Sequence, residues 1–169
     1  MIFIFNYNSY RQEGGLRVDL TDKNPEAVKI CKFMQGTDIL VSADLEGYIH
    51  FWCVTATPHP KKNQLLCSVR DFSESDVGEK AFFPIRAMDF DIETGMLYTG
   101  DEMGYMNKWD ISKLIEKLDD MKPKDFNDGL TEKQREVKQK AAFLTGLNEN
   151  LKVQFSSDDV IQVHRWKAH

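Results

Sequence analysis

One segment of the sequence, residues 125–136, combines side chains that could bind a metal ion. It reads Asp-Phe-Asn-Asp-Gly from Asp125 to Gly129, and Glu136 follows eleven positions after Asp125. Carboxylate and amide oxygens are the ligands that calcium prefers, and a helix–loop–helix calcium loop also closes with Glu. Such a loop needs glycine at its sixth position for a sharp turn, where this chain has Leu130. We therefore expect a solvated turn here, with calcium binding as the alternative.

Other residues that could do chemistry are scattered, or are adjacent in the sequence rather than convergent. The chain has no nucleophile elbow, no phosphate-binding glycine-rich loop and no His-x-x-x-His metal pair. The adjacent acids Asp119-Asp120 and Asp158-Asp159 are typical of solvated loops. The histidines are spread along the chain: His50, His59, His164 and His169. The sequence thus predicts no catalytic, cofactor-binding or metal-ligating residue, and a protein that is not an enzyme.

Composition and charge narrow the class of protein further. The chain has 169 residues, of which 41% are hydrophobic and 29% charged, with a net charge of -5. The negative balance argues against nucleic acid or an anionic membrane as the main partner. The longest apolar run, Met1–Phe5, is too short to span a bilayer and lacks the flanks of a secretory signal, so we expect a cytoplasmic protein.

The three cysteines have a spacing that fits neither a zinc site nor a disulfide framework. They are Cys31, Cys53 and Cys67. An odd number of cysteines is consistent with a reducing compartment, and we expect these residues to act as small buried hydrophobes.

The chain contains an internal repeat with an offset of 57 residues. Residues 39–54 align without gaps with residues 96–111, and the match continues upstream, where Val28, Ile30 and Phe33 align with Ile85, Ala87 and Phe90. The identical pairs are Leu40/Leu97, Asp44/Asp101, Gly47/Gly104, Tyr48/Tyr105 and Trp52/Trp109. A repeat of this kind indicates an architecture built from one supersecondary unit.

Each copy of the repeat predicts a three-stranded antiparallel meander. Apolar and polar residues alternate as they do in strands with one buried face. The predicted strands are 27–33, 39–43 and 48–54 in the first copy, and 85–90, 96–100 and 105–111 in the second. Gly47 and Gly104 end the loop before each third strand, where a hairpin commonly needs a positive φ that glycine adopts without steric cost.

This pattern resembles the WD-repeat family of β-propellers, whose blades end their third strand with Trp-Asp. The second copy ends in Trp109-Asp110, whereas the first has Trp52-Cys53. The resemblance implies an all-β fold: a partial WD-repeat-type β-propeller of about two to three antiparallel blades with a helical insertion.

The resemblance also implies a buried polar tetrad in each blade, of which both copies keep only part. The serine or threonine and the tryptophan are present as Ser42, Trp52, Thr99 and Trp109. The aspartate position holds Glu46 in one copy and Met103 in the other, and no histidine lies near 22–25 or 80–83. Asp44 and Asp101 lie two residues before that position, and we expect their carboxylates to cap turns.

The carboxyl-terminal segment resembles the beginning of a third blade. Val153, Phe155, Val160 and Val163 alternate with polar residues as in an outer strand. His169 resembles the family's histidine, with Ala168 in place of its preceding glycine. Trp166 precedes that histidine, so we treat its equal spacing from Trp52 and Trp109 as a coincidence.

Insertions account for a repeat that is longer than the roughly 40–45 residues of a plain blade. Ser112 predicts the start of a short helix with Leu114, Ile115 and Leu118 on one face, and Thr131 predicts a second helix. The expected order is a leading outer strand and loop (1–26), blade strands (27–54), loop and outer strand (55–84), blade strands (85–111), a charged helical insertion on the rim (112–147), and an outer strand opening a third blade (148–169). The insertion is a solvated surface or, alternatively, a partner-binding arm.

From this resemblance we expect a non-catalytic protein–protein interaction scaffold that is a segment of a larger β-propeller protein. Long insertions and incomplete tetrads are similar to those of multi-propeller proteins of cilia and flagella, which implies a structural component of the ciliary axoneme and microtubule-associated partners. Further blades would come from the same or a neighbouring chain. The alternative is an accessory segment of a larger enzyme or a calcium-responsive regulatory protein.

Overall fold

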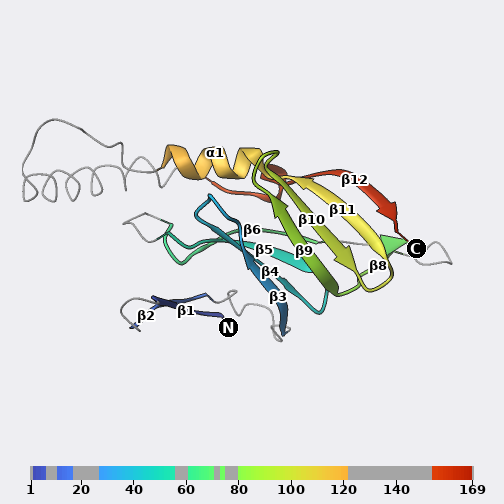
Figure 1. Ribbon diagram of the computed structural model, residues 1–169, viewed down its shortest axis with the longest axis horizontal. Helices are drawn as coiled ribbons and strands as arrows, with labels where there is room; N and C mark the ends of the chain where they lie inside the picture. The colour runs from blue at the N-terminus through green and yellow to red at the C-terminus, as the bar shows by residue number, and fades with distance from the viewer. Residues whose placement is uncertain are drawn as a thin grey trace, which may run out of the picture.

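The computed structural model describes residues 2–6, 11–16, 27–55, 61–70, 73–74, 80–121 and 154–168. Two four-stranded antiparallel sheets dominate this part of the chain (Figure 1). The first sheet contains β3 (Val28–Phe33), β4 (Ile39–Asp44), β5 (Tyr48–Cys53) and β6 (Leu65–Arg70), in that order. The second sheet has the order β12-β11-β10-β9, and its strands are β9 (Ile85–Asp91), β10 (Met96–Asp101), β11 (Tyr105–Asp110) and β12 (Ile161–Lys167).

The remaining elements are short. Two hairpins pair β1 (Ile2–Asn6) with β2 (Arg11–Leu16), and β7 (Ser73–Glu74) with β8 (Lys80–Ala81). One α-helix, α1 (Ser112–Asp120), and one 3-10 helix, η1 (Ser157–Asp159), complete the described elements. The fold is therefore mostly β, as expected from the sequence, and the described residues form two open four-stranded sheets and two short two-stranded ones rather than a closed propeller.

The two four-stranded sheets have the same strand register, and their register shifts lie at equivalent positions. Phe33 lies opposite Leu40 in the first sheet, and Phe90 lies opposite Leu97 in the second. The β3–β4 and β9–β10 ladders each contain a register shift at the same place, and so do β5–β6 and β11–β12. Because a bulge bends a strand and increases its twist, matching bulges give the two sheets the same local twist.

Strand β12 is the fourth strand of the second sheet, paired with β11. Trp166 lies opposite Met106, just as Val69 of β6 lies opposite Ile49. The strand that the sequence placed at the opening of a third blade thus hydrogen-bonds to the sheet before it. Trp166 corresponds to Val69 and not to the tryptophans of the third strands, in agreement with the sequence interpretation.

The main core lies between the two sheets. Side chains of a strand point alternately to its two sides, and the residues of the first sheet that point toward the second form what we call the front face. The front face consists of Ile39, Val41, Ala43, Ile49, Phe51, Cys53, Cys67 and Val69, all buried. It packs against the inner face of the second sheet, whose core residues are Ile85, Met88, Leu97 and Trp109.

Helix α1 belongs to the same core. Leu114 and Leu118 are buried there, and Ile115 packs against them from a partly buried position. This confirms the apolar face predicted for the helix. The helix is part of this core, because Leu114 and Leu118 belong to the cluster between the sheets.

The start of α1 also differs from the expected cap. The Ser112 side chain does not cap the helix: the N-cap residue is Ile111, which has no side-chain cap hydrogen bond. The carboxylate of Asp110 accepts hydrogen bonds from the backbone N–H and the hydroxyl of Ser112. Residues 122–153, including the Asp125 loop and the helix predicted after Thr131, lie outside the described residues, as does His169.

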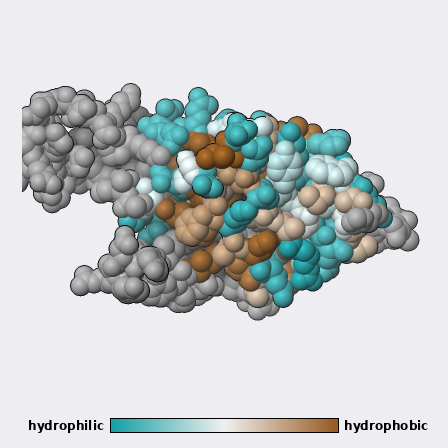
Figure 2. Space-filling view, in the orientation of Figure 1, coloured by the Kyte–Doolittle hydropathy of each residue, from teal (hydrophilic) through white to brown (hydrophobic). Residues whose placement is uncertain are grey.

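Apolar residues also reach the surface. Figure 2 shows brown, hydrophobic residues exposed among hydrophilic ones on the side of the molecule that faces the viewer. On β12, Ile161 is 53% exposed, Val163 51% and Trp166 36%.

Candidate functional site

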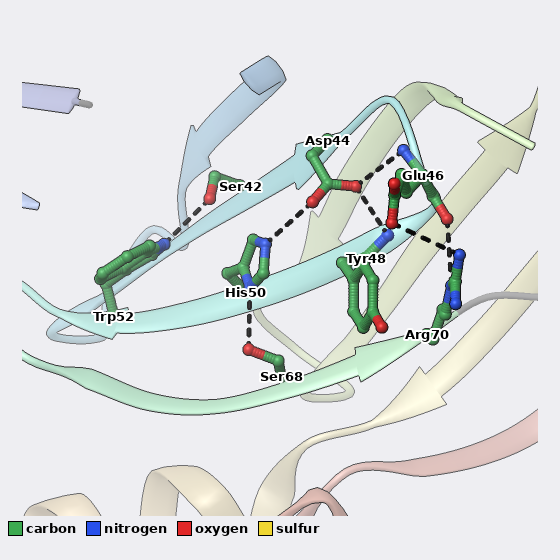
Figure 3. A network of polar contacts seen from close by, with 8 residues as sticks. All are labelled: Ser42, Asp44, Glu46, Tyr48, His50, Trp52, Ser68 and Arg70. Atoms are coloured by element: carbon green, nitrogen blue, oxygen red, sulfur yellow. Dashed lines mark hydrogen bonds and ion pairs between the residues drawn. The ribbon is translucent and has the colours of Figure 1, made fainter. Parts of the chain in front are cut away.

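The side of the first sheet that faces away from the second sheet, which we call the back face, holds a network of polar side chains (Figure 3). Its members are Ser42, Asp44, Glu46, Tyr48, His50, Trp52, Ser68 and Arg70. They come from β4, the turn after it, β5 and β6. This network contains the sequence-predicted Ser42 and Trp52.

Trp52 is joined to Ser42 in the first sheet, and Trp109 is joined to Thr99 in the second. Each indole Nε1 donates a hydrogen bond to a hydroxyl oxygen at 2.9 Å. All four side chains are buried. Because a buried indole N–H without an acceptor is costly, the serine and threonine hydroxyls satisfy the tryptophans that anchor each third strand.

The carboxylates of Asp44 and Asp101 cap the turns between the second and third strands. Asp44 Oδ1 accepts hydrogen bonds from the backbone N–H groups of Glu46 and Tyr48, both at 3.0 Å. Asp101 does the same in the second sheet, at 2.8 and 2.9 Å. The turn-capping role expected for both aspartates is confirmed.

The turn glycines occupy the conformation that the sequence predicts for them. Gly47 has φ +79° and Gly104 has φ +80°. This left-handed conformation is strained for a residue with a Cβ, so glycine closes each turn without steric cost. Asp110, which follows Trp109 in the second copy, is the last residue of β11, and its carboxylate accepts a hydrogen bond from the backbone N–H of Ser112 at the start of α1.

His50 is a member of the network that does not belong to the repeated positions. Its Nε2 lies 3.2 Å from Asp44 Oδ2, and its Nδ1 lies 2.8 Å from the hydroxyl oxygen of Ser68. The His50 side chain is 7% exposed. The signal in the sequence is the alternation Tyr48, His50, Trp52, which places all three side chains on one face of β5.

The electrostatics of the network favour an ionised Asp44. Burial by itself raises the pKa of this carboxyl, but the hydrogen bond from His50 and those from the backbone of Tyr48 and Glu46 outweigh it and hold the pKa below its usual value. Asp44 is therefore a carboxylate that orients the imidazole between itself and Ser68.

An Asp–His–Ser chain is also the order found in hydrolases that activate a serine. Here the serine contacts Nδ1 and the carboxylate contacts Nε2, the reverse of the arrangement in serine proteases. Asp44, His50 and Ser68 lie on β4, β5 and β6, so their contacts link three adjacent strands side by side. We interpret the chain as a structural cross-link of the sheet.

Arg70 closes the network at the edge of the sheet. Its guanidinium lies 4.5 Å from the centroid of the Tyr48 ring and 3.3 Å from that of Phe82. It also donates a hydrogen bond to the carbonyl oxygen of Glu46 at 3.2 Å. Cation–π contacts of this kind hold a long side chain in one place.

A second polar cluster surrounds Asp159, which the sequence assigned to a solvated loop. Its side chain is only 1% exposed, and its carboxylate lies 3.1 Å from Lys113 Nζ and 2.7 Å from Lys117 Nζ. The backbone N–H of Ser156 also donates to it. Sequence spacing could not reveal this site, because its partners are more than forty residues away on α1.

This cluster also affects neighbouring groups. Although burial opposes ionisation of Asp159, hydrogen bonds from Lys117, Ser156 and Lys113 hold the pKa of its carboxyl below the usual value. Burial, with a further contribution from the negative charge of Asp159, raises the pKa of the Cys67 thiol to about 12. Cys67 thus behaves as the small buried hydrophobe that its spacing predicted, and so does Cys53, whereas Cys31 is exposed.

Comparison with known proteins adds no assignment. No protein-family model matches the chain, and no curated protein matches it. Within the described ranges, no group of three or more His, Cys, Asp or Glu side chains could hold a metal ion. No helix in those ranges combines the length and the apolar character needed to cross a bilayer.

Proposed function

We propose that the chain is a non-catalytic interaction scaffold and a segment of a larger β-propeller of the WD-repeat type. One observation carries this: the same four-stranded sheet occurs twice, and the front face of one packs against the inner face of the next. A unit that packs front to back can be repeated, and repeat proteins use such arrays to present extended binding surfaces. Further blades would come from the same or a neighbouring chain.

The Trp–hydroxyl pairs support the resemblance to WD repeats. Ser42 with Trp52, and Thr99 with Trp109, are hydrogen-bonded at equivalent places in the two sheets. These are the tetrad positions that both copies retain in the sequence. His50 joins Asp44 within the first sheet, and this contact supplies a buried acid–imidazole pair in a blade that lacks the family's own.

The polar side chains of the back-face network bond to one another, and this supports a scaffold rather than an enzyme. Asp44, His50 and Ser68 bond to one another across three strands, and Arg70 is held between two rings. Catalysis needs groups directed toward a position that a substrate can occupy. In this network the groups are directed toward their neighbours in the sheet.

The scaffold role can be tested through the complexes that the chain forms. We expect the tagged chain, expressed in its own cells, to elute in complexes larger than itself and to give reproducible cross-links to other proteins by mass spectrometry. A variant with residues 122–153 replaced by a short linker should report whether that segment carries the contacts. It spares α1, whose Leu114 and Leu118 are part of the core. Elution of the unaltered chain at its own mass, without cross-links, would contradict a scaffold.

We further propose that the chain is a structural component of the ciliary axoneme with microtubule-associated partners. This placement is supported by the resemblance of the insertions and incomplete tetrads to those of ciliary propeller proteins. In ciliated cells, we expect a fluorescently tagged chain to co-localise with axonemal microtubules. An even signal throughout the cytosol would exclude this placement and leave the scaffold role in place.

A further inference from the structure

Strand β12 is an edge of the second sheet, and within the described ranges no further strand pairs with its outer side (Figure 1). Its counterpart β6 is also the last strand of its sheet, but Leu66 and Cys67 of β6 are buried and η1 contacts this strand. On β12, by contrast, the large apolar side chains of Ile161 and Val163 are exposed. The two outer strands are equivalent in the repeat, yet β6 is packed into the core and β12 lies at the surface.

The backbone of β12 directs hydrogen-bonding groups outward at alternate residues. The N–H of Ala168 donates to the carbonyl oxygen of Gly104 at 2.8 Å, so this residue is directed inward, toward the rest of the sheet. Hydrogen-bonded and non-hydrogen-bonded pairs alternate along an antiparallel ladder. In the same register, the N–H and C=O groups of Lys167 and Arg165 are therefore directed away from β11. An added strand would meet the backbone of β12 at these two residues.

The side chains of the same two residues give this edge a positive charge. Lys167 and Arg165 lie two positions apart, on one side of the strand. Beside them is the ring of Tyr105, whose centroid is 5.3 Å from the ammonium and 4.5 Å from the guanidinium. No acidic residue occurs between Val160 and Ala168, although the chain as a whole has a net charge of -5. The edge is therefore a local basic strand in an acidic protein.

The equivalent position of the first sheet shows what complements such a cation. Arg70 occupies on β6 the register position that Lys167 occupies on β12. Its guanidinium lies 3.6 Å from the carboxylate of Glu46, in the turn before β5. In the second sheet the position of Glu46 holds Met103, a thioether in place of a carboxylate. Because the turn of the second sheet does not supply this carboxylate, a partner would have to bring it.

Resting on the proposed scaffold role, we infer that β12 pairs with an extended acidic segment of a partner protein, which joins the second sheet as an additional antiparallel strand. The backbone of the segment hydrogen-bonds to β12, as in other cases of strand addition to a sheet edge. Its acidic side chains lie beside Lys167 and Arg165, because directly opposed residues share a face. Its apolar side chains cover Ile161 and Val163. Pairing of β12 with a second copy of itself is disfavoured, since both strands would carry the same cations.

A short synthetic peptide tests this pairing. In the antiparallel register, Glu-Thr-Glu-Thr-Val-Thr-Val places its glutamates opposite Lys167 and Arg165, and its valines opposite Val163 and Ile161. We would titrate it to millimolar concentration into the isotope-labelled full chain and follow the backbone amides by NMR. We expect saturable shifts centred on β12, and slower hydrogen exchange at the amides of Arg165 and Lys167. Absence of these changes would overturn the inference.

Modified peptides separate strand addition from simple charge attraction. N-methylation of the second glutamate removes an N–H that faces β12, whereas N-methylation of the threonine after it removes one that faces solvent. We expect the first change to weaken binding about tenfold and the second to leave it near that of the parent peptide. Equal binding of the two methylated peptides would rule out an added strand.

A charge exchange tests the chemistry of the partner. Lys167→Glu should weaken binding of the acidic peptide and favour the peptide that has lysines in place of its glutamates. Lys29→Glu is the matched control, because it makes the same charge change at an exposed residue of β3 in the first sheet, and it should bind like the parent chain. Indifference of both peptides to Lys167→Glu would contradict an acidic partner. Amide protection of β12 that grows with protein concentration, without peptide, would assign the edge to a second copy and overturn the inference.

The outcome is separable from the test of the scaffold role, since the peptides report on one edge in purified protein and the scaffold role is tested by complexes in cells. Complexes in cells without peptide binding would reject the added strand and keep the scaffold. Peptide binding without complexes in cells would keep the binding edge and reject the scaffold.

Discussion

Lys32 of β3 and Asp89 of β9 form an ion pair between the two sheets, although they occupy the same position in the two copies of the repeat, 57 residues apart. The pair exists because β3 and β9 lie side by side, each the first strand of its sheet. Both side chains are well exposed, and pairs of this kind contribute little to stability. The contact shows how the two sheets are placed: equivalent residues of successive sheets meet at one end of the interface.

Because the Trp–hydroxyl pairs are equivalent in the two sheets, we expect their removal to lower the stability of the chain by similar amounts. Ser42→Ala should leave the buried Trp52 indole N–H without its acceptor and lower the free energy of unfolding by about 1–3 kcal/mol. Thr99→Ala should do the same through Trp109. Urea denaturation measures both, and Ser42→Thr, which keeps the hydroxyl, is the control. Equal stability of Ser42→Ala and the parent would show that the hydrogen bond between Trp52 and Ser42 makes no net contribution to folding stability.

Asp159 predicts loss of stability in acid. The folded state lowers the pKa of its carboxyl, so its contribution is fully present above the pKa of the unfolded chain and is lost as the pH falls through that value toward the lower folded one. Melting temperatures measured from neutral pH to pH 3 should fall less steeply for Asp159→Asn than for the parent. Because Asp44 also has a lowered pKa, some acid sensitivity should remain in that variant. Identical slopes for parent and variant would contradict the role of Asp159.

The cysteines predict a difference in reactivity. The Cys67 thiol is buried and has a pKa raised to about 12, so at pH 8 almost none of it is the reactive thiolate. Cys31 is exposed. Under native conditions, iodoacetamide should alkylate Cys31 first and Cys67 only after denaturant is added, as read by peptide mass spectrometry. Rapid labelling of Cys67 in the folded chain would show that β6 opens from the core.

The equivalent positions Val69 and Trp166 predict opposite responses to a charge. Val69→Asp places an unpaired carboxylate in the core and should cost several kcal/mol, on the order of 3 or more. Trp166→Asp, on the partly exposed counterpart, should leave the melting temperature close to that of the parent. Melting curves followed by circular dichroism measure both variants against the parent. A loss of stability in Trp166→Asp comparable to that in Val69→Asp would show that the Trp166 side chain is buried in the folded chain.

Several features of the fold were predictable because they depend on neighbours in the chain. The six strands of the two repeat copies follow from local alternation, and their bounds in the structure agree with the predicted ranges to within one residue. The turns at Gly47 and Gly104 follow from the need for a positive φ, and the caps at Asp44 and Asp101 follow from carboxylates within reach of the next backbone N–H groups. The repeat itself was visible because identical residues recur at a constant offset.

The candidate site was only half predictable. Ser42 and Trp52 were identified by their place in the repeat, whereas His50 was not, because its partners depend on strand pairing that places Ser68 beside it. Asp159 was missed for the same reason, because its partners depend on the tertiary structure. An acidic doublet in sequence is typical of a solvated loop, but in the fold Lys113 and Lys117 of α1 lie against this carboxylate.

The sequence by itself determined the strands, the turns and the fact that one unit occurs twice, since each depends on residues close together in the chain. The tertiary structure alone decided which copy of a repeated position is buried. Val69 and Trp166 hold the same place in their sheets, yet one lies in the core and the other is partly exposed. The physical reason is that burial depends on what packs against a face, and that is a property of distant segments which local pattern does not record.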